Sequence, residues 1–205
     1  RRDAQIRGGG DIEQFVDPKP DPSIALVVDG IELNGLFAAG LLFDAAQVEV
    51  LRGPQGTRLG SSALAGSINI VSTDADIQDN NFIEAGYGKF SAYQFGGAVG
   101  GDINSALAGR VAVQQYSSDG YIDNEFLGRD DTGKFDELIA KTKLRWDIND
   151  KNKLGLNVIH TNIDNGYDAF SLTNNRNTTF SDMPGHDRQE LTGLALIRGR
   201  PGMLL

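Results

Sequence analysis

The stretch VEVLRGPQGTRLGSSALAGSINIVST, from Val48 to Thr73, has the general make-up of a phosphate-binding loop, with a glycine-rich centre between two apolar alternating runs. A nucleotide loop of the form G-x-x-x-x-G-K-[ST] needs a Lys on the phosphate and a hydroxyl on the metal. The sequence GPQGTRLGSS has no Lys-Ser/Thr step, and Pro54 removes one of the backbone N–H donors. The dinucleotide pattern G-x-G-x-x-G is also absent, so we interpret these glycines as turn formers.

Arg52 is the residue of this stretch that most needs an explanation, because it ends an apolar strand. A buried guanidinium requires an acidic partner. Glu49 is near in sequence but falls on the other strand face, so we expect the partner to come from outside the segment.

Other residue patterns with catalytic or metal-binding chemistry are weak. His160 and His186 lack ligand spacing, and NIDNGYD (162–168) lacks the spacing of a calcium loop. The absence of cysteine excludes disulfides, thiol catalysis and Cys-ligated zinc. No pair of acids stands out as the two carboxylates of a glycosidase. We therefore expect that the protein has no catalytic residue, metal or cofactor and that it is not an enzyme.

Composition narrows the classes of protein further. The chain has 205 residues, a formal net charge of −9 and 40% hydrophobic residues. The acidic balance speaks against a nucleic-acid partner, which favours a basic face. The run LFAAGLLF (36–43) is shorter than the roughly 18 residues of a membrane helix. Because the chain begins with RRDAQIRGGG rather than Met, the lack of a visible signal peptide does not indicate a cytoplasmic protein.

The N-terminal third reads as a small α+β unit. SIALVVDGIEL (23–33) predicts strand, Asp-Gly turn and strand, while VEVLRG and SINIVST predict two more strands. Short helical turns are expected at 42–47 and at 61–66.

After Thr73 the pattern changes to long alternating segments. Strands are expected at 81–88, 91–101, 105–118, 136–148 and 152–163. In the clearest one, even positions carry Leu138, Ala140, Thr142, Leu144, Trp146 and Ile148, and odd positions carry Ile139, Lys141, Lys143, Arg145 and Asp147. Period two with a largely charged opposite face is typical of a strand.

The connections between these strands alternate in length. Short turns at 102–104 and 149–151 alternate with long polar loops at 119–135 and 164–189. This pattern is typical of an outer-membrane β-barrel, whose strands need about 9 to 11 residues to span. A soluble β-sandwich or up-and-down barrel produces the same alternation and stays open, although loops beyond about 15 residues are uncommon in compact domains.

The stretch 48–73 closely resembles the end of the plug domain of TonB-dependent outer-membrane receptors. QIRGGG (5–10) and PSIALVVDGIEL (22–33) resemble plug strands, and YGKFSAYQFGGAVGG, DGYIDN and KTKLRWDINDKNKLGLNV resemble the first barrel strands. The resemblance runs from about Ile6 to Glu190. It departs at Arg58-Leu59-Gly60, where the family has an aromatic residue, which puts ligand contacts there in doubt.

The resemblance implies a fold and a function. It implies an α+β plug at 1–74, followed at 75–205 by antiparallel strands of an incomplete transmembrane β-barrel, which has about 22 strands when complete. The protein would lie in the outer membrane of a Gram-negative bacterium, in contact with lipid. It would import a scarce ligand, most often an iron–siderophore complex, driven by TonB through a TonB box that this chain lacks.

The resemblance also implies roles for particular residues. It assigns plug–barrel contacts with wall glutamates to Arg7 and Arg52, and a plug motif to Gly53, Pro54, Gly56, Gly60, Gly66 and Asn69. It turns Lys141, Lys143 and Arg145 toward the lumen and Leu144, Trp146 and Ile148 toward lipid, with Trp146 in an interfacial aromatic girdle.

Only about six barrel strands are expected, and the tail IRGRPGMLL (197–205) interrupts the alternation of the last one. Unpaired strand edges are costly in lipid. A truncated or frame-shifted gene, or an assembly fragment, is therefore expected. A soluble β-rich binding module, periplasmic or extracellular, is the alternative, and extraction from outer membranes with detergent would separate the two.

Overall fold

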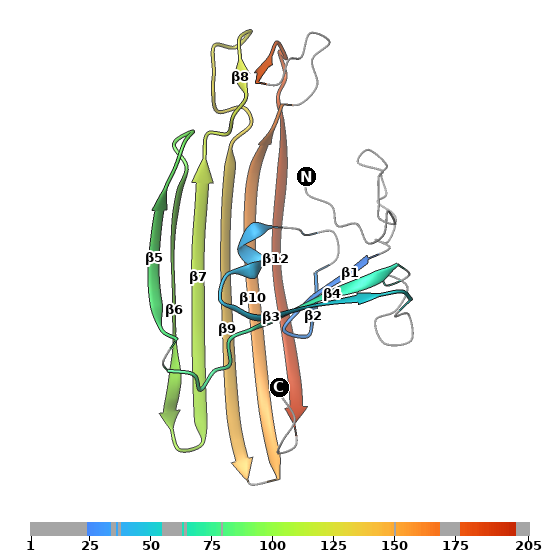
Figure 1. The fold of residues 1–205 in the computed structure, drawn as a ribbon, viewed down its shortest axis with the longest axis vertical. Coiled ribbons are helices and arrows are strands. Elements are labelled where there is room, and N and C mark those ends of the chain that lie inside the picture. The colour runs from blue at the N-terminus through green and yellow to red at the C-terminus, as the bar shows by residue number, and fades with distance from the viewer. Residues whose placement is uncertain are drawn as a thin grey trace.

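Two β-sheets make up almost all of the computed structural model of the protein (Figure 1). The structure describes residues 24–33, 36, 38–54, 63, 65–78, 80–149, 151–168 and 177–199. Within these ranges one helical element is described in full, the 3-10 turn η1 (Ala39–Leu42), and Ala63 also has 3-10 geometry. None of the helices in the described part of the chain is long and apolar enough to cross a membrane.

The smaller sheet has four strands in the order β2-β1-β4-β3. Its strands are β1 (Ile24–Val28), β2 (Ile31–Glu32), β3 (Ala45–Arg52) and β4 (Gly66–Ser72). β1 runs parallel to β4, and the other two pairings are antiparallel. The β1–β2 turn is the predicted Asp-Gly turn, with Asp29 at φ 50 and Gly30 at φ 81, the positive values that a type I′ hairpin requires.

The helical turn predicted at 42–47 is wrong. η1 ends at Leu42 and β3 already begins at Ala45. Ala45 and Gln47 pair with Ser72 and Val71 of β4, and this pairing outweighs the weak helical preference of the alanines. The turn predicted at 61–66 lies mostly outside the described residues, and Gly66 is the first residue of β4.

The larger sheet is antiparallel throughout and has six strands in the order β12-β10-β9-β7-β6-β5. The strands are β5 (Phe82–Tyr87), β6 (Tyr93–Asn104), β7 (Leu107–Ser118), β9 (Phe135–Asn149), β10 (Asn152–Tyr167) and β12 (Gly185–Gly199). Each segment predicted from alternation forms a strand. Antiparallel β structure with little helix is thus confirmed.

The interruption predicted at Ile197 is wrong as far as the described residues reach. β12 continues to Gly199, and Ile197 and Arg198 pair with Gly155 and Leu154 of β10. Arg198 lies on the same face as Leu194 and Leu196, and its Nη2 donates to Asn152 Oδ1 at 2.8 Å, so the pairing with β10 continues past the predicted interruption. Residues 200–205 lie outside the described part of the chain.

The two long connections meet at the same end of the larger sheet (Figure 1). Each contributes a short strand, β8 (Asp123–Asn124) and β11 (Thr178–Thr179), and these pair in parallel. The buried Asn124 side chain donates to Asp168 Oδ2 at 2.8 Å and to the Ser181 carbonyl at 2.8 Å. A polar core therefore joins the two connections.

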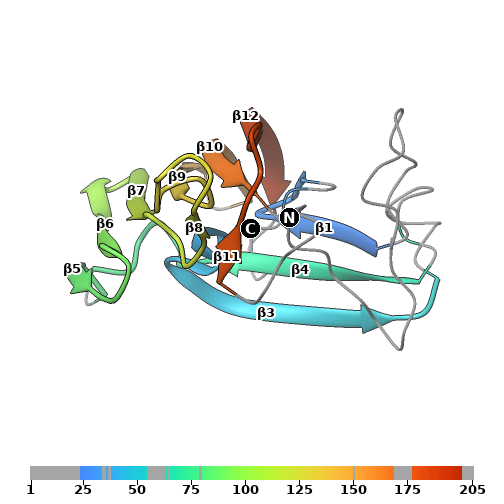
Figure 2. The ribbon, with the colours of Figure 1, turned by 90° about the horizontal axis from the view of Figure 1, so that it is seen from above.

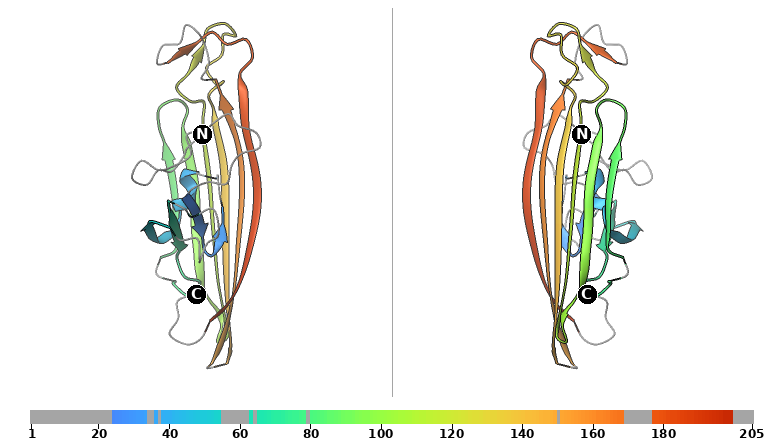
Figure 3. Two further views of the ribbon diagram at one scale, coloured as in Figure 1. Left: turned by 90° about the vertical axis from the view of Figure 1, so that its right-hand side faces the viewer. Right: turned by 90° about the vertical axis from the view of Figure 1, so that its left-hand side faces the viewer.

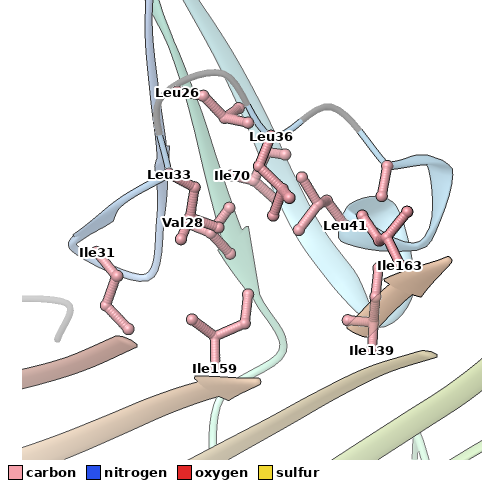
Figure 4. Close-up of a cluster of buried hydrophobic side chains, with 11 residues drawn as sticks. Leu26, Val28, Ile31, Leu33, Leu36, Leu41, Ile70, Ile139, Ile159 and Ile163 are labelled. Atoms are coloured by element: carbon pink, nitrogen blue, oxygen red, sulfur yellow. The ribbon is translucent and has the colours of Figure 1, made fainter. Parts of the chain in front are cut away.

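The smaller sheet and η1 lie against one face of the larger sheet, and their strands run across the long strands (Figures 1 and 2). Seen from the side in Figure 3, the long strands form a single curved layer. The main apolar core fills the space between the two sheets (Figure 4), with Ile139, Ile159 and Ile163 from β9 and β10 against Leu26, Val28, Ile31, Leu33, Leu36, Ala38, Leu41 and Ile70.

Small residues on the larger sheet allow this close approach. A Cβ on Gly96 of β6 would lie 2.8 Å from a ring carbon of Phe43, and a Cβ on Gly193 of β12 would lie 2.5 Å from Ile31 Cγ2. Phe43 also packs edge-on against Phe82, with ring centroids 5.5 Å apart. The absence of side chains at positions 96 and 193 therefore sets how close the two sheets come.

We expect Gly96→Val to loosen the contact with Phe43 and to destabilise the packing by about 1–3 kcal/mol, the usual cost of overpacking. Gly86→Val in β5 is the matched control, because the nearest atom to its Cβ would be Gln94 Cβ at 3.9 Å. Urea unfolding and protease cleavage of the N-terminal unit measure the effect. Equal behaviour of the two variants would contradict this account of Gly96.

Candidate functional site

The contact between the two sheets carries a row of polar side chains on the larger sheet. Arg110 of β7 is opposite Lys143 of β9, and Lys143 is opposite Asn157 of β10. Directly opposed residues share a face of the sheet. All three side chains are buried against the N-terminal unit, which we define as residues 24–54 and 63–78 where the structure describes them.

Arg110 forms a two-pronged ion pair with Asp44, which follows η1. Its Nε donates to Asp44 Oδ2 at 2.8 Å and its Nη2 to Oδ1 at 2.6 Å, and both side chains are only 2% exposed. Arg110 also donates to the carbonyls of Ile77 and Asn80. One guanidinium thus holds both the turn before β3 and the segment that leads into β5.

Lys143 holds the β1–β2 turn to the larger sheet in the same way. Its Nζ lies 2.9 Å from Asp29 Oδ1 and donates to the Ser72 carbonyl at 2.7 Å. Asp29 also accepts from the backbone N–H and hydroxyl of Ser72 at 2.9 and 2.5 Å. Asn157 donates to the Asp29 carbonyl at 2.9 Å. The charged turn is therefore held to both β4 and the larger sheet.

Two further basic residues of β9 extend the contact. Lys141 donates to the carbonyls of Leu41 and Phe43, which closes the C-terminal end of η1. Arg145 Nη1 lies 2.5 Å from Asp76 Oδ2. This hydrogen-bonded guanidinium holds the pKa of Asp76 below its ordinary value.

The predicted positions of Lys141, Lys143 and Arg145 on one face of the strand, toward the N-terminal unit, agree with these contacts. Leu144, Trp146 and Ile148 lie on the opposite face, where Trp146 and Ile148 are about half exposed. Other apolar residues share that face and its exposure: Ile83, Tyr87, Tyr93, Phe95, Val99, Val111, Val113, Leu194 and Leu196. Whether the two faces meet a lumen and lipid stays a prediction.

The predicted plug-motif residues lie in the N-terminal unit as far as the structure describes them. Gly53 has φ 92 and donates its N–H to the Ala65 carbonyl at 3.1 Å, so it forms the turn expected of it. Gly66 pairs with Arg52, and Asn69 donates to Glu49 Oε2 at 3.2 Å. Pro54 is exposed. Gly56 and Gly60 lie outside the described residues.

Arg52 is exposed, at the end of β3 that points away from the larger sheet (Figure 2). Among the described residues it makes no ion pair, and Arg7 lies outside them, so their predicted glutamate partners stay a prediction. The pairs between the two sheets have the opposite polarity, with aspartates on the N-terminal unit and bases on the larger sheet. In the described ranges, no group of three or more His, Asp or Glu side chains is placed to hold a metal.

Known proteins are similar to this chain in sequence and in fold over part of its length, although no family model matches the chain. The pesticin receptor of Yersinia pestis is 34% identical over 141 residues, which span 68% of this chain and 20% of that protein. The solved ferric yersiniabactin uptake receptor FyuA from Yersinia pestis superposes with a TM-score of 0.62 at 31% identity, over 71% of this chain and 23% of that one.

The chain is a homologue of TonB-dependent receptors. The vitamin B12 transporter BtuB of Vibrio vulnificus (strain YJ016) is another relative, 28% identical over 78% of this chain and 27% of its own length. These relatives are receptors and transporters rather than enzymes. The chain spans about a quarter or less of the TonB-dependent receptors that it matches.

Four residues of the interface were not identified from the sequence: Arg110, Asp44, Asp29 and Asn157. A clue was present for Arg110, which is a single charge within the apolar alternating segment LAGRVAV. Asp29 reads as a turn residue, and nothing in its neighbourhood indicates that its carboxylate points back into an interface. Asp44 and Asn157 carry no local pattern at all.

We expect Asp44→Asn to destabilise the contact strongly, because it leaves Arg110 buried without its counter-charge. Removing one partner of a buried pair costs about 3–5 kcal/mol. Asn tolerates the left-handed backbone of Asp44, at φ 56, so the change isolates the charge. Chemical unfolding gives the size of the loss.

Asp131→Asn serves as the control, since the Arg129–Asp131 pair is about half exposed and should contribute little. A loss at position 44 no larger than that at position 131 would refute the role assigned to Arg110.

Proposed function

We propose that this chain belongs to a TonB-dependent outer-membrane receptor that takes up a scarce ligand using energy from the inner membrane. Residues 1–74 form the C-terminal part of its plug, and residues 75–205 form the first strands of its transmembrane β-barrel. The observation that carries the proposal is the contrast between the two faces of the larger sheet. One face binds the N-terminal unit through buried ion pairs, and the other exposes large apolar side chains.

The exposed apolar face supports a membrane location. One continuous row of cross-strand partners runs across five strands of this face. It consists of Val99, Val111, Thr142, Val158 and Leu194, and all but Thr142 are apolar. Soluble proteins rarely expose apolar patches that extend over several strands. An outward apolar band with aromatic residues is the pattern of a barrel wall in lipid. A soluble β-rich binding module, the alternative function, would require another partner to cover this face.

We propose an iron–siderophore complex as the ligand. The supporting observation is the set of relatives, which includes the catecholate siderophore receptor Fiu of Escherichia coli, 34% identical over 46% of this chain, and FyuA. BtuB keeps vitamin B12 as the second candidate. TonB would supply the pull on the plug, and the outer membrane of a Gram-negative bacterium would be the location.

The test is uptake by cells that lack their own siderophore receptors and express the complete gene under iron limitation. We expect radioactive iron to accumulate from a siderophore mixture, and accumulation to stop when TonB is deleted or proton-motive force is collapsed. Cobalamin uptake is measured in the same cells to separate the two ligands. Recovery of the protein in the periplasm, with no energy-dependent uptake, would favour the soluble module.

We further propose that Arg7 and Arg52 contact glutamates of the barrel wall. Arg52 is exposed among the described residues, which leaves it available for a wall strand beyond them. Arg52→Ala should let the plug unfold more easily and let small solutes leak, because it removes one of the contacts that hold the plug in the barrel. Exposed or hydrated pairs of this kind are individually weak, which lets the plug be released under force. Conductance of the purified receptor in planar bilayers measures the leak, with Arg129→Ala as control. Unchanged conductance would remove Arg52 from the plug–barrel contact.

A further inference from the structure

The segment that joins the N-terminal unit to the larger sheet is hydrogen-bonded to the first strands of that sheet. This joining segment, residues 73–81, runs from the end of β4 to β5 (Figure 2). Arg110 of β7, which also holds the turn before β3, donates to the carbonyls of Ile77 and Asn80 at 3.3 and 3.0 Å. Asn81 exchanges two hydrogen bonds with the backbone of β6. Directional and partly charge-assisted bonds thus fix the unit on this side, which we call the hinge side.

The contact with β10 and β12, at the other side of the unit, is largely apolar. Ile159 and Ile163 of β10 belong to the main core, and Ile31 packs over Gly193 of β12. Asn157 adds a hydrogen bond to the carbonyl of the β1–β2 turn. Apolar contact has no directional requirement, so it does not fix the orientation of the unit as ion pairs and hydrogen bonds do. We call this side the opening side.

A cavity of about 270 Å³ lies between the opening side and the larger sheet. Val27, Asp29 and Ser67 line it from the N-terminal unit, and Asn157 and Ile197 line it from β10 and β12. Ser67 is fully buried, and its hydroxyl has no hydrogen-bond partner in the protein. Buried polar groups ordinarily have a partner, and a polar cavity of this size is roomy enough for water. The opening side therefore admits water next to the β1–β2 turn.

Lys143, which lies between the two sides, has two acidic neighbours. Its Nζ is 2.9 Å from Asp29 Oδ1 and 3.9 Å from Oδ1 of Asp74 in the joining segment. The Asp29 side chain is 6% exposed and that of Asp74 is 38% exposed. A buried cation that loses its partner is costly, but here a second carboxylate is within reach. Among the described residues, Arg110 forms an ion pair with Asp44 and with no second carboxylate.

We propose that the N-terminal unit opens as a hinged body when it is pulled. The β1–β2 turn leaves β10 and β12 first, and Lys143 exchanges Asp29 for Asp74. Arg110 keeps its bonds to Asp44 and to the joining segment. A passage then forms along the inner face of β10 and β12, beginning at the cavity beside Ser67. The inference rests on the proposed transport function, for which it names the moving side of the plug and the route of the ligand.

Thiol labelling of the purified receptor, expressed from its complete gene, tests the order of opening. Ser67→Cys reports on the opening side and sacrifices no hydrogen bond within the protein. Ala112→Cys reports on the hinge side, where Ala112 is 2% exposed and packs with Phe43. The 205 residues contain no cysteine, and any cysteine in the rest of the receptor is replaced by serine.

In urea below the unfolding transition, we expect Ser67→Cys to react with a maleimide about tenfold faster than Ala112→Cys, because local opening exposes one side before the other. Ala98→Cys, in the same cluster, takes the place of Ala112→Cys if that variant does not fold. Equal labelling rates at the two sides would show that the unit leaves as one piece and would overturn the proposal.

A second variant tests the exchange of partners at Lys143. Asp74→Asn removes the reserve carboxylate, so labelling of Ser67→Cys should slow several-fold. The unfolding midpoint should change little, because Asp74 is 38% exposed and 3.9 Å from Lys143. Asp131→Asn makes the same change in charge in the connection 119–134 and should leave the labelling rate as it is. An unchanged rate in Asp74→Asn would refute the exchange.

Labelling in whole cells connects the opening to transport. Ser67→Cys should become reactive only in cells that have TonB and proton-motive force, while Ala112→Cys stays protected. Protection of both cysteines in cells that accumulate iron would overturn the hinged opening and leave the transport function intact. A lack of energy-dependent uptake defeats the transport function instead, and the urea experiment, which needs no energy source, still decides how the unit opens.

Discussion

The structure depends on the placement of two like charges side by side on a strand ladder. Arg110 and Lys143 are directly opposed on β7 and β9, an arrangement that destabilises a sheet when nothing compensates it. Asp44 and Asp29 of the N-terminal unit supply the compensation at contact distance, in an environment from which water is largely excluded. The inner face of the larger sheet is thus electrostatically complete only with the N-terminal unit bound to it. Buried ion pairs add little net stability, but their loss is costly, which makes them specific for one docking position.

The row next to the charged one contains small residues, which allow the N-terminal unit to approach the larger sheet closely. Ala98, Ala112, Lys141, Ile159 and Gly193 are successive partners across five strands, and the small members leave room for apolar side chains of the N-terminal unit. Phe43 packs against Ala98 and Ala112, and Ile31 lies over Gly193. Charge fixes which unit docks and in which register, and small residues let it approach closely enough to bury an apolar core. Beside η1, longer polar side chains such as Glu84, Gln94 and Gln114 replace the small ones and leave a hollow.

Sequence periodicity was sufficient to find the strands and their faces, because alternation is a local property. The segment 138–148 assigned Lys141, Lys143 and Arg145 to one face correctly, and the Asp-Gly turn placed β1 and β2. The ion pairs were not accessible in the same way. Asp29 and Lys143 are separated by more than a hundred positions, and their contact depends on how two sheets cross, which no local pattern records. The helical turn at 42–47 failed for a related reason, since β4 lies far along the chain and its pairing with Ala45 and Gln47 overrode local preference.

The polarity of the interface has a consequence for charge in the rest of the molecule. On the larger sheet, inward-facing cations form ion pairs with Asp29, Asp44 and Asp76 and hydrogen bonds with two backbone carbonyls of the N-terminal unit. Glu84, which lies beyond that contact, is held instead by the side-chain amides of Gln94 and Gln114. Docking of the N-terminal unit thus follows from this distribution of charge. A substitution that frees Arg110 from Asp44 would leave a buried cation directly opposite Lys143 without its counter-charge, so docking of the unit depends strongly on a single guanidinium.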